Sequence, residues 1–268
     1  MQEANQKLHI DRNLAIIIIK LALHQGVKNL KYLIAGDSAL IIEFGNDIST
    51  ETNNKIRVFN DLIKSAKIQG ITETVPTFRS LLIYYDPSKI YFDELKSKIE
   101  KLSKNLDSKS ETNKKIIEIP VCYGGSFGED LEFVAEHAKL TTREVIQIHT
   151  SREYLIYMLG FLPGFAYLGG LDSRLFTPRL KNPRTRIDAG SVGIGGEQTG
   201  IYPLASPGGW RLIGTTPVKP YDANRQEPIL YKAGDYIKFV EISQSDFYEI
   251  KNLVDKNLYH CNVIERGF

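Results

Sequence analysis

The loss of helical periodicity after Arg152 constrains the fold of this 268-residue chain more than any other feature. From that point to Ile242, apolar residues occur in short runs rich in β-branched and aromatic side chains, separated by Gly or Pro. Such runs predict strands joined by turns, because Gly and Pro adopt turn conformations and interrupt helices. The clearest runs are residues 153–159, 191–194, 210–214 and 236–242. Many short strands in succession are typical of a closed or nearly closed β-barrel.

The first third of the chain alternates between the two periodicities. Residues 32–35 and 39–44 form apolar runs around a Gly36-Asp37 turn, and further strand candidates follow at 71–76 and 80–85. Two helices are predicted by stripes of apolar residues at three- and four-residue spacing. The stripes are Ile56, Phe59, Ile63 and Ala66, and then Phe92, Leu95, Ile99, Leu102 and Leu106. This alternation favours a small α+β domain with two helices on a sheet.

The polar segment from Ser103 to Lys115 is the best linker in the sequence, because it has too few apolar residues to pack in a core. We therefore expect an α+β domain at residues 31–106, a linker at 107–115, and a barrel domain with flanking helices at 116–268. Residues 1–30 are an N-terminal extension, or sequence upstream of a true start near Lys31. The apolar stretch at 14–23 contains Lys20 and is too short to span a bilayer.

Composition excludes several classes of function. The formal net charge is only +2, and the lysines are scattered, so we do not expect nucleic-acid binding. The two cysteines and five histidines show no spacing typical of a metal site. We expect a soluble cytoplasmic protein with no metal and no membrane association.

The glycine-rich run from Pro183 to Pro217 is the densest candidate for function. Gly195 and Gly200 have the separation of the glycines in a phosphate-binding loop. However, Ile201 and Tyr202 stand where that loop needs Lys and Ser or Thr, so we expect no nucleotide site of its own.

Arg184 and Arg186 in that run are separated by one residue. In an extended strand both guanidinium groups point to one face and can grip a carboxylate or phosphate, although a solvated strand edge is the alternative. Gln198, Ser206 and the 208–210 turn would supply small residues, backbone amides and a flat indole wall beside them. This combination predicts a site for an anion and an amide.

A second motif, GFLPGFAYLGGL, covers residues 160–171. Its aromatic residues are typical of packing at a barrel end, whereas an exposed Phe161 or Phe165 would indicate a partner surface. His149 precedes the motif and is a candidate acid or base, with a buried structural histidine as the alternative. No arrangement of nucleophile and base can be argued, so the chain lacks a complete catalytic apparatus.

These motifs resemble one known family closely. The segments are AGDSALIIEFG from Ala35, GFLPGFAYLGGL, RTRIDAGSVGIGG followed by QTGIYP, and SPGGWRLIGTTP. They are similar, in order, to the allophanate hydrolase subunit 1 family, over roughly Tyr32 to Ile242. That family includes the B subunit of bacterial 5-oxoprolinase and the sporulation-kinase inhibitor KipI.

The resemblance implies an α+β N-terminal domain followed by a cyclophilin-like β-barrel domain. It also implies a sister subunit of the allophanate hydrolase subunit 2 family and a third component, which together convert 5-oxo-L-proline to L-glutamate. ATP is then a co-substrate of the complex, not bound by this chain alone, and the chain is not active alone. The alternative is a KipI-like inhibitor that binds a sporulation-type histidine kinase. Prolyl isomerase activity rests on fold analogy only.

The resemblance also implies site residues. The expected catalytic residues are His149, Arg184, Arg186 and Gln198, and the expected substrate-binding residues are Ser206, Gly208, Gly209 and Trp210. Two positions depart from the family pattern. Asp188 follows Ile187 where Val-Pro is common, and Thr215 stands where the family has an arginine, so the site would carry one cation fewer.

Overall fold

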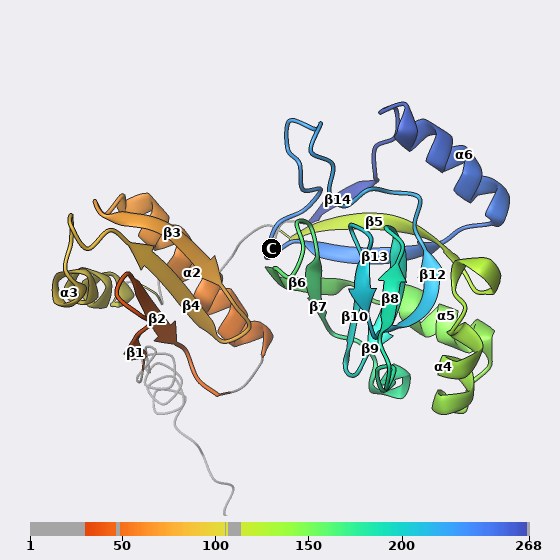
Figure 1. Cartoon of the computed structure of the whole chain (residues 1–268), viewed down its shortest axis with the longest axis horizontal. Coiled ribbons are helices and arrows are strands. Elements are labelled where there is room, and N and C mark those ends of the chain that lie inside the picture. Colours follow the sequence, from red (N-terminus) through yellow and green to blue (C-terminus); the bar gives the residue numbers. More distant parts are fainter. Residues whose placement is uncertain (1–29, 47–48, 105, 107–113, 267–268) are drawn as a thin grey trace, which may run out of the picture. The chain divides into compact units, whose positions relative to one another are not determined.

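The structure is a computed structural model that describes residues 30–46, 49–104, 106 and 114–266 (Figure 1). The chain divides into two compact units, one of residues 1–47 and 58–110 and the other of residues 48–57 and 111–268. The predicted N-terminal extension, apart from residue 30, and residues 107–113 of the predicted linker at 107–115 lie outside the described residues. The proposed domain boundaries therefore stay predictions.

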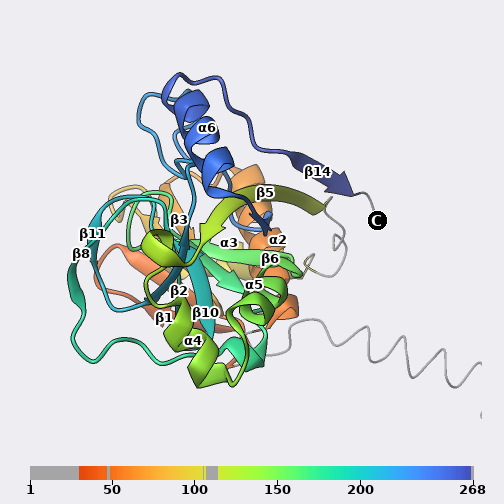
Figure 2. The same cartoon turned by 90° about the vertical axis from the view of Figure 1, so that its right-hand side faces the viewer.

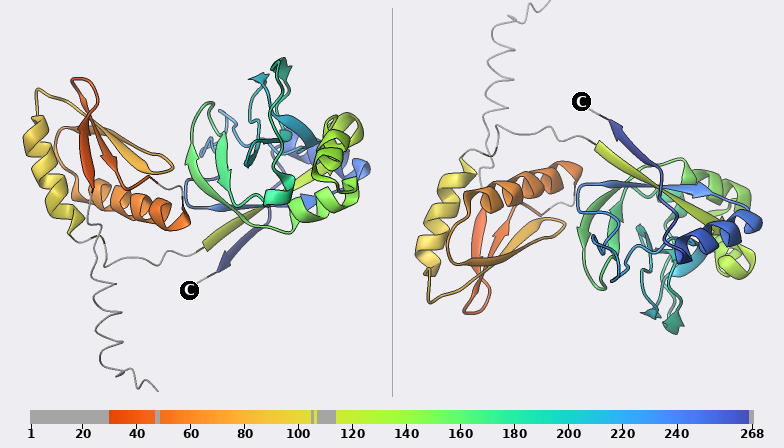
Figure 3. Two further views of the ribbon diagram at one scale, coloured as in Figure 1. Left: turned by 90° about the horizontal axis from the view of Figure 1, so that it is seen from below. Right: turned by 90° about the horizontal axis from the view of Figure 1, so that it is seen from above.

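The first unit contains an antiparallel four-stranded sheet in the order β1-β2-β4-β3. Its strands are β1 (Lys31–Ile34), β2 (Ala39–Glu43), β3 (Ile71–Pro76) and β4 (Ser80–Tyr85). Helices α2 (Thr50–Ala66) and α3 (Phe92–Ser103) lie beside it (Figure 3). Phe59 and Ile63 of α2, and Leu95 and Ile99 of α3, are fully or almost fully buried. The predicted α+β part is confirmed.

A seven-stranded closed barrel forms the centre of the second unit. The sheet order is β12-β9-β10-β7-β6-β13-β5-β14, and an additional pairing between β12 and β5 closes the ring. The barrel strands are β5 (Lys114–Tyr123), β6 (Tyr154–Leu159), β7 (Ala166–Gly169), β9 (Ser191–Gly195), β10 (Gln198–Ile201), β12 (Arg211–Thr215) and β13 (Tyr236–Glu241). The predicted barrel is confirmed.

The length of β5 explains how eight strands give a ring of seven. Its first residues pair with β14 (Val263–Arg266), and its last residues, Cys122 and Tyr123, pair with β12. Because β5 has ten residues, one strand serves both as a member of the ring and as the support of β14. Two further short strands, β8 (Arg184–Ile187) and β11 (Ser206–Gly208), form a separate ribbon.

Helices α4 (Leu131–Ala138) and α5 (Thr142–Thr150) pack on one another at one side of the barrel, and α6 (Gln244–Asp255) lies apart from them (Figure 2). The predicted capping box opens α5, because Thr141 and Glu144 exchange side-chain to backbone hydrogen bonds of 2.7 and 3.2 Å. Short 3-10 turns occur at η2 (Gly125–Phe127) and η3 (Ser173–Leu175). In the described part of the chain, no helix is long and apolar enough to cross a membrane.

Candidate functional site

Three aromatic rings join the two dense sequence motifs into one cluster. Phe165 comes from the 160–171 motif, whereas Tyr202 and Trp210 come from the glycine-rich run. The Phe165 ring centroid lies 5.7 Å from that of Tyr202 and 5.5 Å from that of Trp210, both in edge-on contacts. All three side chains are buried. The motifs are therefore one packed structure, and Phe165 is the residue that connects them.

The glycines of β9 and β10 make room for the indole. A Cβ atom at Gly195 would lie 2.3 Å from Cδ1 of Trp210, and one at Gly200 would lie 3.0 Å from its Cζ3. Trp210 is 5% exposed, so its ring rests on these glycines and not against solvent. The expected flat wall for a ligand is not formed. The glycine-rich strands serve close packing, since no larger residue fits under the ring.

The two arginines expected to form one clamp are separated by a β-bulge. In the ribbon, Ser206 pairs with Ile187 and Gly208 pairs with Arg184, so β8 has one residue more than β11 between these pairs. A bulge breaks the strict alternation of side chains along a strand. Arg186 is exposed and its Nε bonds Asp188 at 2.9 Å, whereas Arg184 is mostly buried. The joint clamp is therefore corrected to two arginines with different surroundings.

Arg184 belongs to an ion-pair cluster at the start of α4. Its Nη2 lies 2.9 Å from Oδ2 of Asp130, and its Nε lies 3.0 Å from Oε1 of Glu129. Its Nη1 donates to the carbonyl of Trp210 at 3.2 Å. With both charge and hydrogen bonds satisfied inside the chain, Arg184 is a positioning residue that fixes the Trp210 backbone.

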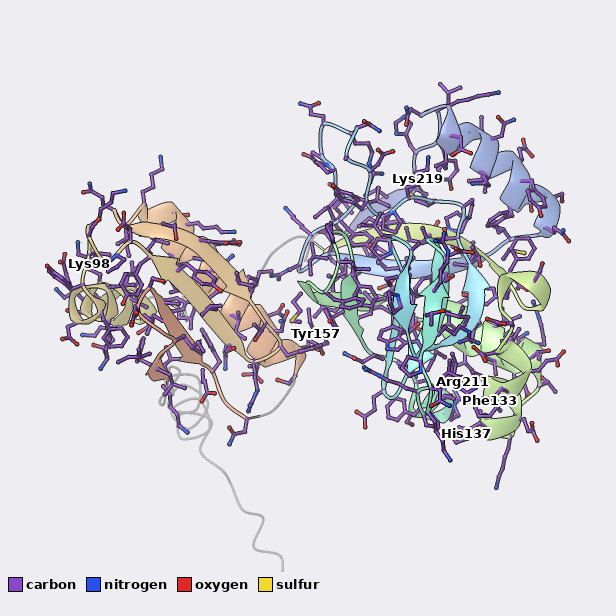
Figure 4. All side chains as sticks on the ribbon, in the orientation of Figure 1. Lys98, Phe133, His137, Tyr157, Arg211 and Lys219 are labelled. Carbon is purple, nitrogen blue, oxygen red and sulfur yellow. The ribbon has the colours of Figure 1, made fainter. Side chains whose placement is uncertain are left out.

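Asp130 is the residue of this cluster that sequence reasoning missed. Its buried carboxylate also accepts the Leu212 N–H at 2.7 Å and lies 3.4 Å from Nη1 of Arg211. The Arg211 guanidinium lies 3.6 Å from the Phe133 ring centroid (Figure 4). The adjacent acids Glu129 and Asp130 at the start of a helix could have been noted in the sequence. Their partners, however, are too distant in sequence for local patterns to reveal.

Ser206 is a predicted site residue with a buried polar side chain. It is 8% exposed, and its hydroxyl has no hydrogen-bond partner among the described residues. A buried hydroxyl without a partner costs about 1–3 kcal/mol, so such a group in a native protein calls for a ligand or a bound water. The neighbouring Gly208 is needed for space, because a Cβ there would lie 2.5 Å from the Tyr202 hydroxyl.

Residues 179–181, which lie against Gly209 and Trp210, form a basic segment. The Leu180 N–H donates to the Gly209 carbonyl at 2.7 Å, and the Arg179 guanidinium lies 5.8 Å from the Trp210 ring centroid. Arg179, Lys181 and Arg186 are exposed. We call these three residues the basic rim. Gln198 is half-buried at the start of β10, opposite Gly195.

His149 lies in the barrel core, where both ring nitrogens are hydrogen-bonded. Thr199 donates its hydroxyl proton to the Gly193 carbonyl at 3.0 Å, so it accepts from Nε2 of His149 at 2.8 Å. Nδ1 then accepts from the Tyr123 hydroxyl at 2.8 Å, which assigns the neutral Nε2–H tautomer. Burial lowers the His149 pKa to about 3. Of the two roles predicted for His149, this geometry favours the structural one.

The two departures from the family pattern have local explanations. Asp188 pairs with Arg186, and Thr215 donates to the Phe127 carbonyl at 2.7 Å. The first lowers the net charge of the basic rim. The second replaces a possible cation with a backbone bond. Among the described residues, no group of three or more His, Cys, Asp or Glu side chains is placed to hold a metal.

Comparison with known proteins connects this site to a family. The family model for the carboxyltransferase domain, subdomain C and D, matches residues 30–231. The chain belongs to this carboxyltransferase family. The B subunit of 5-oxoprolinase from Bacillus subtilis is 44% identical over 226 residues, which are 81% of this chain and 94% of the relative. The same subunit of Escherichia coli O157:H7 is 41% identical over 78% of this chain and 94% of the relative.

The predicted membership of the allophanate hydrolase subunit 1 family is confirmed by these matches. A solved structure, that of TTHA0988, is also similar to this carboxyltransferase-family chain, with a TM-score of 0.69 and 36% identity. The match covers 76% of this chain and 40% of that protein. The chain thus spans about two fifths of the length of TTHA0988.

Proposed function

We propose that this chain is the B subunit of a multi-subunit, ATP-dependent 5-oxoprolinase, which opens the lactam ring of 5-oxo-L-proline to give L-glutamate. The observation that carries this proposal is the match to two curated 5-oxoprolinase B subunits at 41% and 44% identity over about four fifths of the chain. The KipI-like inhibitor of a histidine kinase is not favoured by these relatives. The barrel is then of the cyclophilin-like type, and the complex acts in the cytoplasm.

The substrate chemistry fits the surface around Ser206. 5-Oxoproline carries one carboxylate and one lactam amide, so its recognition needs a cation and groups that bond an amide. Arg186 is the exposed cation of the ribbon, and its pair with Asp188 is exposed as well, so we assign Arg186 to the carboxylate. We assign the Ser206 hydroxyl to the lactam. This contact requires the buried hydroxyl to become accessible when the substrate binds, and it would relieve the cost of its burial.

Gln198 and the backbone amides of the 208–209 turn are the remaining polar groups proposed for the site. We assign them to the lactam carbonyl, whose oxygen becomes more negative as its carbon is attacked. Hydrogen-bond donors held in place at such an oxygen stabilise the transition state more than the ground state. A Cβ at Gly209 would meet only ordinary van der Waals contacts, with the nearest atoms, of Leu180 and Pro183, at 3.6 Å.

We propose that the active site is shared between this chain and its partner subunits. Arg184 is neutralised by Glu129 and Asp130, and His149 is enclosed in the core, so neither is available to a substrate in the described chain. We propose that the sister subunit of the allophanate hydrolase subunit 2 family and the third component supply the ATP site and the groups that activate the lactam. ATP is then a co-substrate of the complex.

The test is reconstitution of the complex from this chain and its two partner components, with ATP-dependent formation of L-glutamate as the measurement. We expect activity only when all components are present. Ser206→Ala and Arg186→Gln should each raise the KM for 5-oxoproline about tenfold, the usual effect of one lost charged or buried hydrogen bond. Arg143→Gln, an exposed arginine paired with Glu241, is the matched control. Wild-type kinetics for both site variants would overturn the assignment of the site.

A further inference from the structure

The second unit contains a cavity that lies away from the ribbon and its basic rim. Its volume is about 590 Å³, within the range of pockets that hold small molecules. Lys219 lies at its edge, and Figure 4 shows this residue at the opposite end of the barrel from Arg211 and Phe133. The cavity is therefore separate from the candidate site.

Three segments distant in sequence build the cavity. The first is the start of β5, where Lys115 and Ile117, two residues apart, both line it. The second is the loop at 218–230, which is held to itself by a bridge between Tyr221 and Ile229. The third follows α6, where Asn257 adopts a left-handed conformation with φ of 57°. This reversal brings residues 259–261 back across the cavity before β14.

The lining has an excess of positive charge. Lys115, Lys219 and Arg225 contribute three cations, and Asp222 is the one acidic residue that lines the cavity. Lys219 is paired with Asp255 at 2.9 Å, whereas Lys115 and Arg225 form no ion pair within the described part of the chain. The Asp222 carboxylate is engaged locally, since it accepts the Asn224 N–H at 2.9 Å. Neither Lys115 nor Arg225 is thus bonded to a carboxylate, although Glu265 of β14 lies opposite Lys115 and the charge of Lys115 also acts on Asp235.

Arg225 is held in place by the protein but not satisfied by it. One of its terminal nitrogens donates to the carbonyl oxygens of Pro220 and Pro228, at 3.1 and 2.8 Å. Its Nε is buried and has no hydrogen-bond partner among the described residues. A guanidinium group fixed in this way is preorganised to bond an oxyanion through its other terminal nitrogen, Nη1, because the entropy of ordering the side chain is already lost.

Much of the remaining wall is apolar, although Asn224, Asn257 and His260 also line the cavity. Val218, Leu230, Val254 and Val263 line it together with the Tyr259 ring. Cys261 also lines the cavity, and burial raises the pKa of its thiol to about 11. Positive groups on an apolar wall match a ligand that has an acidic group on an apolar body.

We propose that this cavity is a second ligand site, which binds a small organic anion with an apolar body through Lys115 and Arg225. Ligand binding at this site does not depend on 5-oxoproline turnover, so it can be tested separately from the proposed function. A ligand seated there would also cover the Cys261 thiol. The segment that connects α6 to β14 forms one wall of the cavity. A bound ligand would therefore contact the chain between these two elements.

The experiment uses anilinonaphthalene sulfonate, a fluorescent anion with an apolar body, on the full chain. We expect saturable fluorescence, and about a tenfold rise in Kd for Arg225→Gln and for Lys115→Gln. Lys115 makes no hydrogen bond that supports the loop, so its variant remains informative if the Arg225 variant misfolds. Lys98→Gln, an exposed lysine on α3, is the control with the same charge change and should bind as the wild type.

A second measurement places the probe. Iodoacetamide labelling followed by peptide mass analysis distinguishes Cys261 from the buried Cys122. We expect saturating probe to slow labelling of Cys261 at least fivefold and to leave the rate at Cys122 unchanged. An unchanged rate at Cys261 would overturn the proposal, as would equal affinities of the Lys115→Gln and Lys98→Gln variants, because the probe would then be bound elsewhere.

Discussion

Asp130 and Arg184 are 54 residues apart in the sequence, and their side chains meet at 2.9 Å beneath the Trp210 backbone. The carboxylate is buried and also holds the Leu212 N–H and Arg211. This one acid therefore fixes the start of β12 and both arginines that flank Trp210. The position of the candidate site depends on it, although Asp130 itself contacts no substrate in the proposed arrangement.

We predict that Asp130→Asn destabilises the fold by about 2–4 kcal/mol, because removal of one partner of a buried ion pair leaves the other charge uncompensated. Urea unfolding of the isolated chain measures the change. Asp188→Asn is the matched control, since Asp188 is exposed and its pair with Arg186 contributes about 0–1 kcal/mol. Equal stability of the two variants would contradict the role given to Asp130.

The buried His149 predicts a pH dependence of stability. Its pKa is about 3 in the folded chain and about 6.5 when unfolded, so the unfolded state binds the extra proton between these values. Stability from this residue is fully present above pH 6.5 and is lost as the pH falls, by about 1.4 kcal/mol per pH unit. His149→Gln should lose about 2 kcal/mol less than the wild type between pH 6.5 and 5.

The difference between His149→Gln and the wild type should be constant between pH 7 and 8, where the imidazole is neutral in both states. Urea unfolding at each pH gives the curves. Parallel curves over the whole range would show that His149 has the same pKa in the folded and the unfolded chain. A variant that folds and keeps its place in the complex also separates the two predicted roles, because a structural histidine leaves turnover by the folded complex nearly unchanged.

Packing against the indole makes Gly195→Ala costly. The added methyl group would lie 2.3 Å from the Trp210 ring, and such overpacking typically costs about 1–3 kcal/mol. Gly209→Ala is the control, because its methyl group meets only ordinary contacts at 3.6 Å. We expect the Gly209 variant to keep wild-type stability within about 0.5 kcal/mol and to lose activity in the complex. Equal melting temperatures for the two variants would exclude the packing role of Gly195.

Phe161 is the exposed aromatic residue of the 160–171 motif, and we predict that it belongs to a partner surface. It is 64% exposed, its backbone has φ of 68°, and its ring contacts Phe165 edge-on. A bulky residue in the left-handed region is strained, and such residues are found at functional sites. We predict that Phe161→Ala weakens binding to the sister subunit about tenfold or more, as loss of an aromatic anchor does. Calorimetric titration with that subunit measures the effect.

Tyr248→Ala removes an equally exposed aromatic ring from α6 and should not change that affinity. If Phe161→Ala binds the sister subunit as tightly as the wild type, the exposed ring has another purpose. Thermal unfolding of the isolated Phe161→Ala variant tests whether weaker binding comes from a loss of stability instead. We expect its stability to remain within about 0.5 kcal/mol, because the side chain is mostly in solvent.

Asp188 lowers the net positive charge of the basic rim. Its exposed carboxylate holds the Arg186 guanidinium at 2.9 Å. Asp188→Asn removes that charge, so we expect the KM for 5-oxoproline to fall about two- to threefold at low salt, consistent with the small free energy of an exposed ion pair. Steady-state kinetics of the reconstituted complex at low and high salt test this. A KM that rises would show that Asp188 orients Arg186 for the substrate.

Local patterns in the sequence determined most of the secondary structure. The three-and-four spacing of Phe59 and Ile63 placed a helix, the Thr141 and Glu144 pair marked the start of another, and short apolar runs marked four of the barrel strands. These features act between residues a few positions apart, so they can be read without knowledge of the fold. The family resemblance was also carried by contiguous motifs.

Only the tertiary structure decided what the motif residues do. Alternation predicted one face for Arg184 and Arg186, but the bulge opposite β11 separates them. The indole of Trp210 was expected to be a wall for a ligand, yet it packs on Gly195 and Gly200. Asp130, the barrel closure between β12 and β5, and the cavity behind β14 depend on contacts between distant segments. Such contacts arise from packing and charge pairing in three dimensions, which no local periodicity records.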